Sequence, residues 1–324
     1  MKASLEVIPL DKLQSVFDKE TIIEKVKEAY IHHAEGKVNS PPPGQLLFDG
    51  LKGDCHIKYG HVIGAPYFAI KIASGHYDNP KIGLPVNSGL VIVMSAKTGM
   101  PVTILADEGW ITSWRTAAAG CLAARSMLPS SVEAIGMIGS GHQAGLQLEW
   151  VRPFLNTNKV FVWNVDPFKS EAETFVNELN QKGFDAKLAD SSQELTEKCR
   201  LIYTTTPSTQ ALFDSTDIKP GTHIVALGAD SPGKQELDTE VFGRASRIAT
   251  DDHHQCLNHG DFGNAVRAGK VSEHTDVQLG DILSGKIQGR VSDEDITIVD
   301  LTGIPALDIA MATLFCDRLG IKAG

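Results

Sequence analysis

The pattern of apolar and polar positions divides the chain into a mixed first part and a regularly alternating second part. A helical period predicts a helix over residues 11–36, with an apolar face formed by Ile22, Ile23, Val26, Ala29 and Tyr30. The segment SPPPGQ then interrupts the chain. From about residue 46 to 100, the runs DCHIKYGHV, YFAIKIAS and GLVIVMSAKTGMPVTIL read as strands. The Ala-rich segment EGWITSWRTAAAGCLAARSML predicts a long helix that ends before Pro129.

After Pro129 the pattern changes to strands and helices in turn. EAIGMIGSG leads into HQAGLQLEWVRPFL, and KVFVWNV leads into FKSEAETFVNELNQKG. The apolar runs LIYTTT, HIVALGA, RIATDD and ITIVDLTG follow. This alternation is typical of βαβ units with a mostly parallel sheet, so the fold class is α/β. We expect one domain over residues 1–129 and a second over 130–304, with a last helix at 305–324.

Composition narrows the class of protein. The chain has 324 residues, 42% of them hydrophobic and 22% charged, which suits two globular domains. A net charge of −10 disfavours nucleic acid as a partner, because such binders need a basic face. We expect no membrane association, since no run approaches the roughly 20 apolar residues of a span. Five cysteines without a C-x-x-C pair, and no signal peptide, favour a reducing cytoplasm.

A dinucleotide site is indicated by the segment IGMIGSGHQAGLQLE. It carries G-x-G-x-x-A at Gly139, Gly141 and Ala144, directly after a predicted strand and at the start of a predicted helix. Glycines there permit a tight turn, so that a pyrophosphate can lie at the helix N-terminus. The next strand, VFVWNV, places Asn164 and then Asp166 at the ribose-reading position.

The loop GADSPGKQEL resembles a P-loop only in part. Gly228, Gly233 and Lys234 have the right spacing, but Gln235 replaces the hydroxyl residue that binds Mg²⁺. Asp230 follows the apolar strand HIVALGA, at the end where parallel sheets present groups to ligands. We therefore expect Asp230 to act in chemistry rather than in phosphate binding, although a plain turn residue is the alternative.

Five motifs in this order, KIASGHYDNPKIGLP, WRTAAAG, IGSGHQA, GADSPGKQEL and DLTG, resemble the ornithine cyclodeaminase/μ-crystallin family over nearly the whole chain. The resemblance implies a homodimer in which an N-terminal α+β domain serves dimerisation and substrate binding. It also implies that the last helix returns to this domain and that the second domain is a Rossmann NAD(P) domain. Members exchange a hydride between a nicotinamide and an imino or amino carbon next to a carboxylate.

The resemblance also assigns site residues. Lys71 and Arg115 match the family's ligands of the substrate carboxylate, and Asp230 matches the aspartate at the substrate nitrogen. Asp230 and Lys71 are the expected catalytic residues. Further substrate-binding candidates are Lys58, His56, Gln45, Lys234 and Thr302. The expected cofactor-binding residues are Arg115, Thr116, Gly139, Gly141, His142, Gln143, Asn164, Asp166, Thr205, Leu227, Gly228, Ala229 and Asp230.

Two departures from the family pattern bear on the substrate. Gln45 stands where many members have an arginine, and His56, with Lys58 two residues on, stands near the glutamate that cyclodeaminases use for the distal amine. A cation at Lys58 would repel an ammonium and attract an anion. The pattern therefore favours an imino acid, including one with a second carboxylate, over ornithine.

The sequence leads to one main functional hypothesis and several alternatives. We expect an NAD(P)H-dependent reductase that converts a small 2-imino acid, such as Δ1-pyrroline-2-carboxylate or iminosuccinate, to the L-amino acid. The alternatives are a cyclodeaminase with bound NAD, an alanine dehydrogenase-like enzyme and a non-catalytic ligand binder. Asn164 and Asp166 favour NADH, while Lys169 keeps NADPH open. The histidines of DDHHQCLNHGD have no spacing that suits zinc, so no metal is expected.

Overall fold

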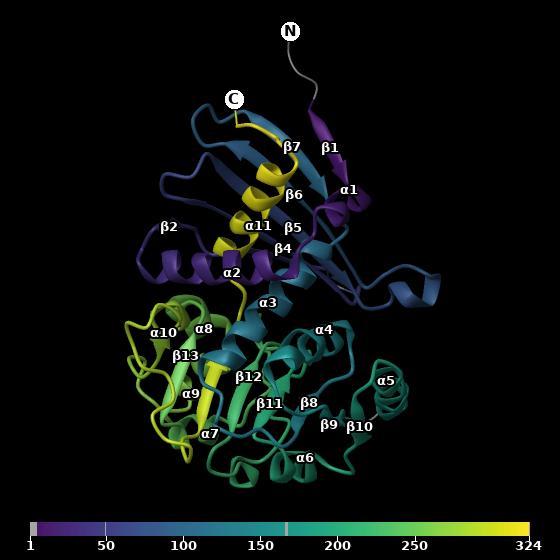
Figure 1. Ribbon diagram of the computed structural model, residues 1–324, viewed down its shortest axis with the longest axis vertical. Helices are drawn as coiled ribbons and strands as arrows, with labels where there is room; N and C mark the ends of the chain where they lie inside the picture. The colour runs from purple at the N-terminus through teal and green to yellow at the C-terminus, as the bar shows by residue number, and fades with distance from the viewer. Residues whose placement is uncertain (1–4, 49, 166–167, 324) are drawn as a thin grey trace. The chain divides into compact units, whose positions relative to one another are not determined.

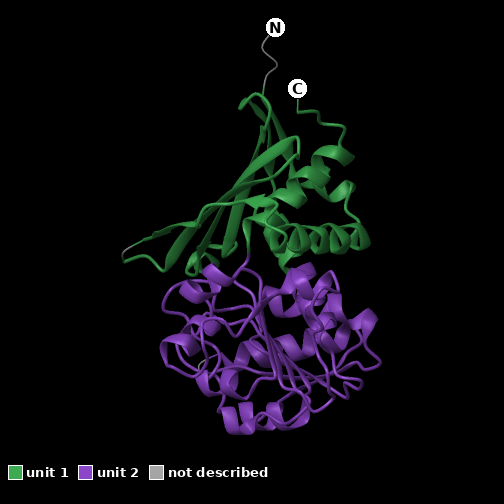
Figure 2. Cartoon of the chain, turned by 90° about the vertical axis from the view of Figure 1, so that its left-hand side faces the viewer, with its two compact units in different colours: residues 1–116, 304–324 green, residues 117–303 purple. Residues whose placement is uncertain are grey.

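The computed structural model describes residues 5–48, 50–165 and 168–323 (Figure 1). The chain forms two compact units: residues 1–116 with 304–324, and residues 117–303 (Figure 2). The first unit ends and the second begins inside helix α3 (Trp110–Ser126), after Thr116. The pattern of strands and helices in the sequence had placed this boundary after residue 129. No helix within the described ranges is long and apolar enough to cross a membrane.

The first unit is built on a seven-stranded sheet. The strands are β1 (Glu6–Pro9), β2 (Val38–Asn39), β3 (Gly44–Leu47), β4 (Gly53–Val62), β5 (Tyr67–His76), β6 (Asn87–Ser95) and β7 (Pro101–Ala106). Their order is β1-β7-β6-β5-β4-β2, with β3 also paired to β4. The β1–β7 pair is parallel and the other pairs are antiparallel. A short 3-10 helix, η1 (Asn79–Ile82), lies between β5 and β6.

Helices cover one face of this sheet. Helix α11 (Pro305–Arg318) lies against β4 and β5, and α2 (Lys19–Ala34) packs on α11 (Figure 1). The five apolar residues predicted to share the face of α2 are all buried, which confirms that prediction. The single helix expected over 11–36 was wrong, because α1 (Leu10–Ser15) ends before α2 begins. Asp18 caps α2 by accepting a hydrogen bond from the Thr21 backbone N–H at 3.0 Å, which fixes the break.

The second unit has a parallel sheet of eight strands. They are β8 (Ile135–Ile138), β9 (Lys159–Trp163), β10 (Asp185–Leu188), β11 (Leu201–Thr204), β12 (His223–Ala226), β13 (Arg247–Thr250), β14 (Val277–Gln278) and β15 (Thr297–Asp300). Their order is β10-β9-β8-β11-β12-β15-β13-β14, and every pair is parallel. The strand order reverses direction between β8 and β11, which is where doubly wound sheets bind ligands. The expected α/β Rossmann-type fold is confirmed.

Helices connect these strands. They are α4 (His142–Val151), α5 (Lys169–Gln181), α6 (Ser192–Lys198), α7 (Thr239–Arg244), α8 (His253–His259), α9 (Asp261–Arg267) and α10 (Leu279–Leu283), with the 3-10 helices η2 (Arg152–Phe154) and η3 (Ser215–Asp217). The strands β8, β11, β12 and β15 are buried along their whole length, as expected of parallel strands covered on both faces. Functional groups of this unit are therefore found at the strand ends.

Candidate active site

A row of polar side chains crosses the helix-covered face of the first unit's sheet. Lys58 of β4 pairs with Lys71 of β5, and His56 of β4 pairs with Gln45 of β3. Residues two apart on a strand share a face, so Lys58 and His56 point to the same side as Lys71. Gly60, two residues further on, lies against Ile309 of α11, which shows that this is the side α11 covers. Lys58 and Lys71 are buried, with 7% and 3% of their surface exposed.

A buried carboxylate joins Lys71 to Arg115. The Lys71 ammonium lies 3.1 Å from Oδ2 of Asp308, and Arg115 donates from Nε to Oδ1 of the same residue at 3.2 Å. Arg115 comes from α3 and Asp308 from the first turn of α11, where a carboxylate also meets the positive end of the helix dipole. Arg115 and Asp308 are buried as well. Three segments distant in sequence thus place two cations around one carboxylate.

The charges in this cluster alter one another's pKa. Burial above all, with the charges of Arg115 and Lys58, lowers the pKa of Lys71 to about 7, although Asp308 raises it. Burial alone would raise the pKa of Asp308, but Lys71, Arg115 and Lys58 together bring that pKa below its usual value. Asp308 is therefore ionised and Lys71 changes charge near neutral pH. Lys58 and Arg115 bring further positive charge to this face, which suits an anion.

The other expected substrate residues of this unit lie further from Lys71. Nε2 of His56 is 3.7 Å from Oδ2 of Asp54, and its side chain is 19% exposed. Gln45 is exposed at the edge of the sheet, although its register with His56 keeps it on the same row. Thr116, which was expected at the cofactor, is half-buried on α3, directly after Arg115.

In the second unit, the turn between β8 and α4 has the backbone of a dinucleotide site. Gly139 has φ +107°, and a Cβ there would lie 2.7 Å from Oγ1 of Thr205. Gly141 caps α4 without a side chain, and an added Cβ there would meet open space. The first turn of α4 begins with His142, which is exposed, and Gln143, which is half-buried. Its uncapped backbone N–H groups fit a pyrophosphate, so this chain's own geometry suits NAD.

The expected ribose position lies where β9 ends. Asn164 donates from Nδ2 to Oγ of Ser140 at 2.9 Å and accepts from the Val165 backbone N–H at 2.9 Å. These bonds aim its side chain at the glycine turn. Asp166, the other expected residue here, lies outside the described residues. A cavity of about 90 Å³ next to Asn164 is lined by Trp163, Asn164, Lys169, Leu188, Ala189 and Asp190.

The loop after β12 presents Asp230 to solvent. The Asp230 side chain is 42% exposed, and Nζ of Lys234 lies 2.7 Å from its Oδ1. Lys234 therefore pairs with the Asp230 carboxylate. This pairing disfavours the interpretation of the loop as a phosphate-binding P-loop. Leu227 bonds through its N–H to the Thr204 carbonyl at 3.0 Å, and Ala229 is buried. These contacts anchor the loop to β11 and the core.

A residue that sequence reasoning missed, Glu236, holds the base of this loop. Its Oε2 accepts hydrogen bonds from Thr204 Oγ1 and the Gly228 N–H, both at 2.7 Å. Its Oε1 accepts from the Thr206 N–H at 2.5 Å and from Thr206 Oγ1 at 2.8 Å. A Cβ at Gly228 would lie 2.1 Å from the Thr206 carbonyl oxygen, so this position requires glycine. Glu236 thus binds the loops after β11 and β12 together.

Two further buried acids stand beside Glu236. Oδ1 of Asp261 accepts the N–H groups of Glu236 and Leu237 at 2.9 and 3.1 Å, and Oδ2 of Asp300 accepts the Phe262 N–H at 2.8 Å. Burial and the charge of Glu236 raise the pKa of Asp261 to about 7. Burial and Asp261 raise the pKa of Asp300 well above its usual value. Asp300 is therefore harder to ionise than an exposed aspartate.

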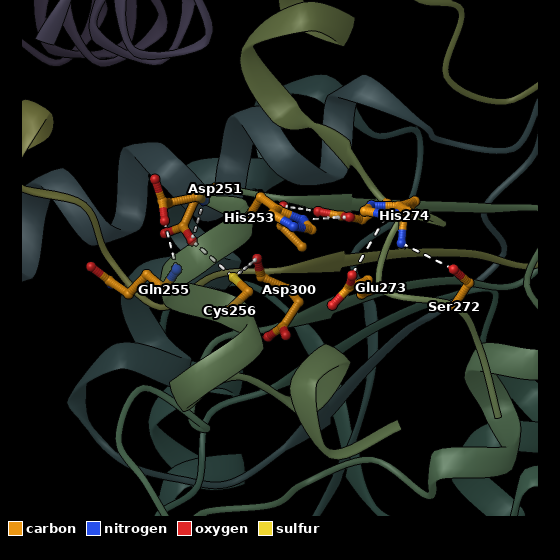
Figure 3. A network of polar contacts seen from close by, with 11 residues as sticks. Asp251, His253, Gln255, Cys256, Ser272, Glu273, His274 and Asp300 are labelled. Carbon is orange, nitrogen blue, oxygen red and sulfur yellow. Dashed lines mark hydrogen bonds and ion pairs between the residues drawn. The ribbon is translucent and has the colours of Figure 1, made fainter. Parts of the chain in front are cut away.

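Thr302, expected near the substrate, is buried and serves the turn after β15. Its hydroxyl donates to Oδ1 of Asp251 at 3.0 Å and accepts from Nε2 of Gln255 at 2.8 Å. Figure 3 shows Asp251 with Cys256 beside it; the Cys256 thiol donates to Oδ1 of Asp251 at 3.3 Å. Burial raises the pKa of Cys256, so this thiol stays a donor. The hydroxyl of Thr302 is thus already engaged on two sides.

The histidine-rich segment that forms α8 begins beside a carboxylate. Nδ1 of His253 lies 2.8 Å from Oδ1 of Asp276, whose other oxygen accepts from Oγ1 of Thr250 at 2.6 Å. Figure 3 places His253 and His274 in this neighbourhood. Within the described ranges, no group of three or more His, Cys, Asp or Glu is arranged to hold a metal ion.

A family model confirms the resemblance read from the motifs. The model of the ornithine cyclodeaminase/mu-crystallin family matches residues 11–322. The chain belongs to this family. Because the match covers both units, the family assignment includes the cluster of Lys71, Arg115 and Asp308 as well as the glycine turn before α4.

Three members illustrate how the chain relates to the family. A solved archaeal alanine dehydrogenase dimer with bound NAD shares 32% identity and a TM-score of 0.87, with 97% of this chain and 95% of that chain covered. Thermococcus litoralis Δ1-pyrroline-2-carboxylate reductase, solved with NADH and L-proline, shares 25% identity and a TM-score of 0.88 over 99% and 100%. An iminosuccinate reductase from Paracoccus denitrificans is 33% identical over 94% of both chains.

Proposed function

We propose that this protein is an NADH-dependent reductase that converts a small 2-imino acid to the L-amino acid. The observation that carries the proposal is the buried set of Lys58, Lys71 and Arg115 in the first unit. Buried cations are stable only with anionic partners, and Asp308 is such a partner for Lys71 and Arg115. A substrate carboxylate suits the same positively charged face, and the Nη1 and Nη2 donors of Arg115 fit it.

The protein is an oxidoreductase that acts on imino and amino groups, and its cofactor is NAD. The residues that would hold NAD are Gly139, Gly141, His142 and Gln143 at the pyrophosphate and Asn164 at the ribose, while Thr205 and the residues from Leu227 to Ala229 line the nicotinamide end. When bound, the nicotinamide supplies the hydride for the C=N carbon. The relatives solved with NAD or NADH support this assignment.

Asp230 is the group we assign to the substrate nitrogen. A carboxylate next to a C=N nitrogen stabilises the iminium form and can relay its proton. Lys234, 2.7 Å from Asp230, pairs with that carboxylate and restricts its orientation. Lys71 and Arg115 hold the α-carboxylate during the reaction. The simultaneous presence of these charged groups favours catalysis over a purely ligand-binding role.

The substrate candidates are a cyclic ketimine, Δ1-pyrroline-2-carboxylate, and the acyclic iminosuccinate. Both activities occur among the relatives. Lys58 and His56 on the same row as Lys71 favour a substrate with negative charge at its distal end. The same row disfavours ornithine, whose distal ammonium would meet Lys58. An alanine dehydrogenase-like activity is the second candidate, because an archaeal alanine dehydrogenase matches nearly the whole chain and its reaction also passes through a 2-imino acid.

We also propose that the protein is a cytoplasmic homodimer. The outer face of the first unit's sheet carries exposed apolar side chains: Ile57 and Tyr59 of β4 are 39% and 41% exposed, and Leu46 of β3, which pairs with Cys55 on the same face, is 55% exposed. An exposed apolar surface of this kind is typical of a protein interface. The archaeal alanine dehydrogenase was solved as a dimer. Light scattering tests this, since a fully active monomer would contradict it.

A substrate screen tests the proposed function. Purified protein with NADH is offered Δ1-pyrroline-2-carboxylate, oxaloacetate with ammonia, and pyruvate with ammonia, and oxidation of NADH is followed by absorbance. We expect one imine to be reduced at a kcat of the order of 1 s⁻¹ or faster. Oxidation of NADH with pyruvate and ammonia would favour the alanine dehydrogenase-like activity. No oxidation of NADH with any imine would contradict the proposal.

A further inference from the structure

Asp308 has no role in the motifs, yet it lies at the centre of the charged cluster. It is 1% exposed and contacts Lys71 through Oδ2 and Arg115 through Oδ1. Each oxygen therefore serves a different cation, and the carboxylate plane sets the direction of both. The contact to Arg115 uses Nε, which leaves the Nη1 and Nη2 donors for a second acceptor.

The surroundings of Lys71 make this carboxylate necessary. Lys71 pairs across the sheet with Lys58 on one side and with Val91 of β6 on the other. The charged or titratable groups facing it are Lys58 and, further along the row, His56 of β4, Arg115 of α3, Asp308 of α11, and Asp107 before α3. Burial raises the pKa of Asp107. Without Asp308, the lysine would face mainly cations in a low-dielectric interior.

We propose that Asp308 is a positioning residue, which holds the ammonium of Lys71 protonated and fixed beside the guanidinium of Arg115 so that both cations can receive the substrate carboxylate. This inference rests on the proposed function for the identity of the anion. The charge effect itself is a property of the first unit. Asp308 is not expected to touch the reacting atoms.

Direct titration of Lys71 tests the proposal without any assay of activity. In protein labelled with ¹³C at lysine Cε, the Lys71 signal is assigned by its absence in Lys71→Met. The wild-type signal should titrate near pH 7, where the pKa of Lys71 lies. In Asp308→Asn the midpoint should fall by about one pH unit or more, because an opposite charge in contact has been removed. An unchanged midpoint would overturn the proposal.

Two further variants separate charge from general disruption. Asp308→Glu keeps the charge and should return the midpoint closer to the wild-type value than to that of Asp308→Asn. Asp317→Asn removes an exposed carboxylate from the same helix, so it should leave the Lys71 midpoint unchanged. Should Asp308→Asn fail to fold, the ¹³C signal of the Asp308 carboxyl in wild-type protein decides. That signal should shift as Lys71 titrates, and an absence of response would contradict the contact.

The kinetic readout distinguishes this inference from the proposed function. In wild-type enzyme, substrate affinity should weaken as pH rises through the Lys71 midpoint, since the neutral amine no longer attracts a carboxylate. In Asp308→Asn the same weakening should begin about one pH unit lower or more. If the protein reduces no imine but the Lys71 midpoint still moves, the proposed function fails and the role of Asp308 in the charge of Lys71 stands. If imines are reduced and the Lys71 midpoint does not move in Asp308→Asn, the proposed function stands and the role of Asp308 in the charge of Lys71 fails.

Discussion

Asp230 is an exposed carboxylate held by a lysine four residues later, on a loop whose base is fixed by Glu236. The Asp230 side chain is 42% exposed, as a group that must meet a substrate requires. Arg115 is the opposite case: it is buried and fixed by Asp308. At the scale of residues, our account therefore assigns proton handling to Asp230 and anion binding to Arg115.

Replacing Asp230 by asparagine should remove catalysis and leave the fold intact. The amide is nearly isosteric but cannot stabilise an iminium or accept a proton, so kcat should fall by roughly 10²-fold or more. Binding of NADH, measured by fluorescence, should stay near the wild-type value. The matched control Asp185→Asn, at an exposed position of β10, should keep full activity. Near wild-type turnover in Asp230→Asn would exclude the assigned role.

Replacing Arg115 by lysine keeps the charge and loses the planar pair of donors. KM should rise by roughly tenfold or more, with a smaller change in kcat, because bidentate binding of the carboxylate is lost. Arg125→Lys, near the exposed end of the same helix, is the matched control and should leave KM unchanged. If KM for Arg115→Lys equals the wild-type value, Arg115 serves only the fold.

At the scale of elements, buried acids join the ends of β11, β12 and β15. Glu236 accepts four hydrogen bonds from Thr204, Thr206 and Gly228, and Asp261 accepts the N–H groups of the segment that carries Glu236. The loops that would contact the nicotinamide are thus held by carboxylates rather than by apolar packing alone. Their stability must depend on pH.

Asp261→Asn should reveal this dependence. The pKa of Asp261 is raised to about 7 from an unfolded value of 3.8, so the contribution of this group is fully present below about pH 4 and is lost as pH rises through 7. The asparagine keeps an oxygen for the two N–H groups and removes the charge. The excess of its melting temperature over that of the wild type should grow between pH 5.5 and pH 8.5, by the equivalent of about 1–3 kcal/mol, because the wild-type contribution is lost over that range. The same difference in melting temperature at both pH values would contradict the buried charge.

Some helices and turns could be predicted from the sequence, and others could not. Local patterns gave the apolar face of α2 and the glycine turn before α4, because both depend on residues near each other in the chain. The break between α1 and α2 was missed, although Asp18 is a typical N-cap, because the helical period continues across it. Strand β1 was missed because its pairing with β7 joins residues about a hundred positions apart.

The candidate site shows the same limit. Lys71, Arg115 and Asp230 were identified because motifs of a known family carry them, and their roles remain predictions. Glu236 stood inside the quoted loop, but its four contacts come from two segments, residues 204–206 and Gly228. Asp308 lies in an otherwise apolar helix segment, and this alone indicates a buried ion pair, since a buried acid needs a partner. Its partners could not be named before the fold brought β5 and α3 to it.

At the scale of the whole molecule, the cofactor preference is the next prediction. Asn164 is hydrogen-bonded to Ser140, and Asp190 and Lys169 both line the adjoining cavity, so an added 2′-phosphate would meet a carboxylate as well as a cation. We expect kcat/KM for NADH to exceed that for NADPH by about two- to tenfold. The comparison uses one substrate at fixed pH, with Lys169→Gln as the variant that should weaken any use of NADPH. A tenfold advantage for NADPH would identify Lys169 as a phosphate ligand.

The reaction stoichiometry tests the central claim, that the protein is a net imine reductase, most directly. Purified protein is incubated with a limiting amount of NADH and an excess of the imine found in the screen, and NADH, the amino acid product and free ammonia are measured in the same sample. Our account predicts one amino acid formed for each NADH oxidised, with product formation stopping when NADH is exhausted. L-ornithine without added NADH should give no ammonia. Release of ammonia from ornithine with no net change in NADH would contradict the account and identify a cyclodeaminase.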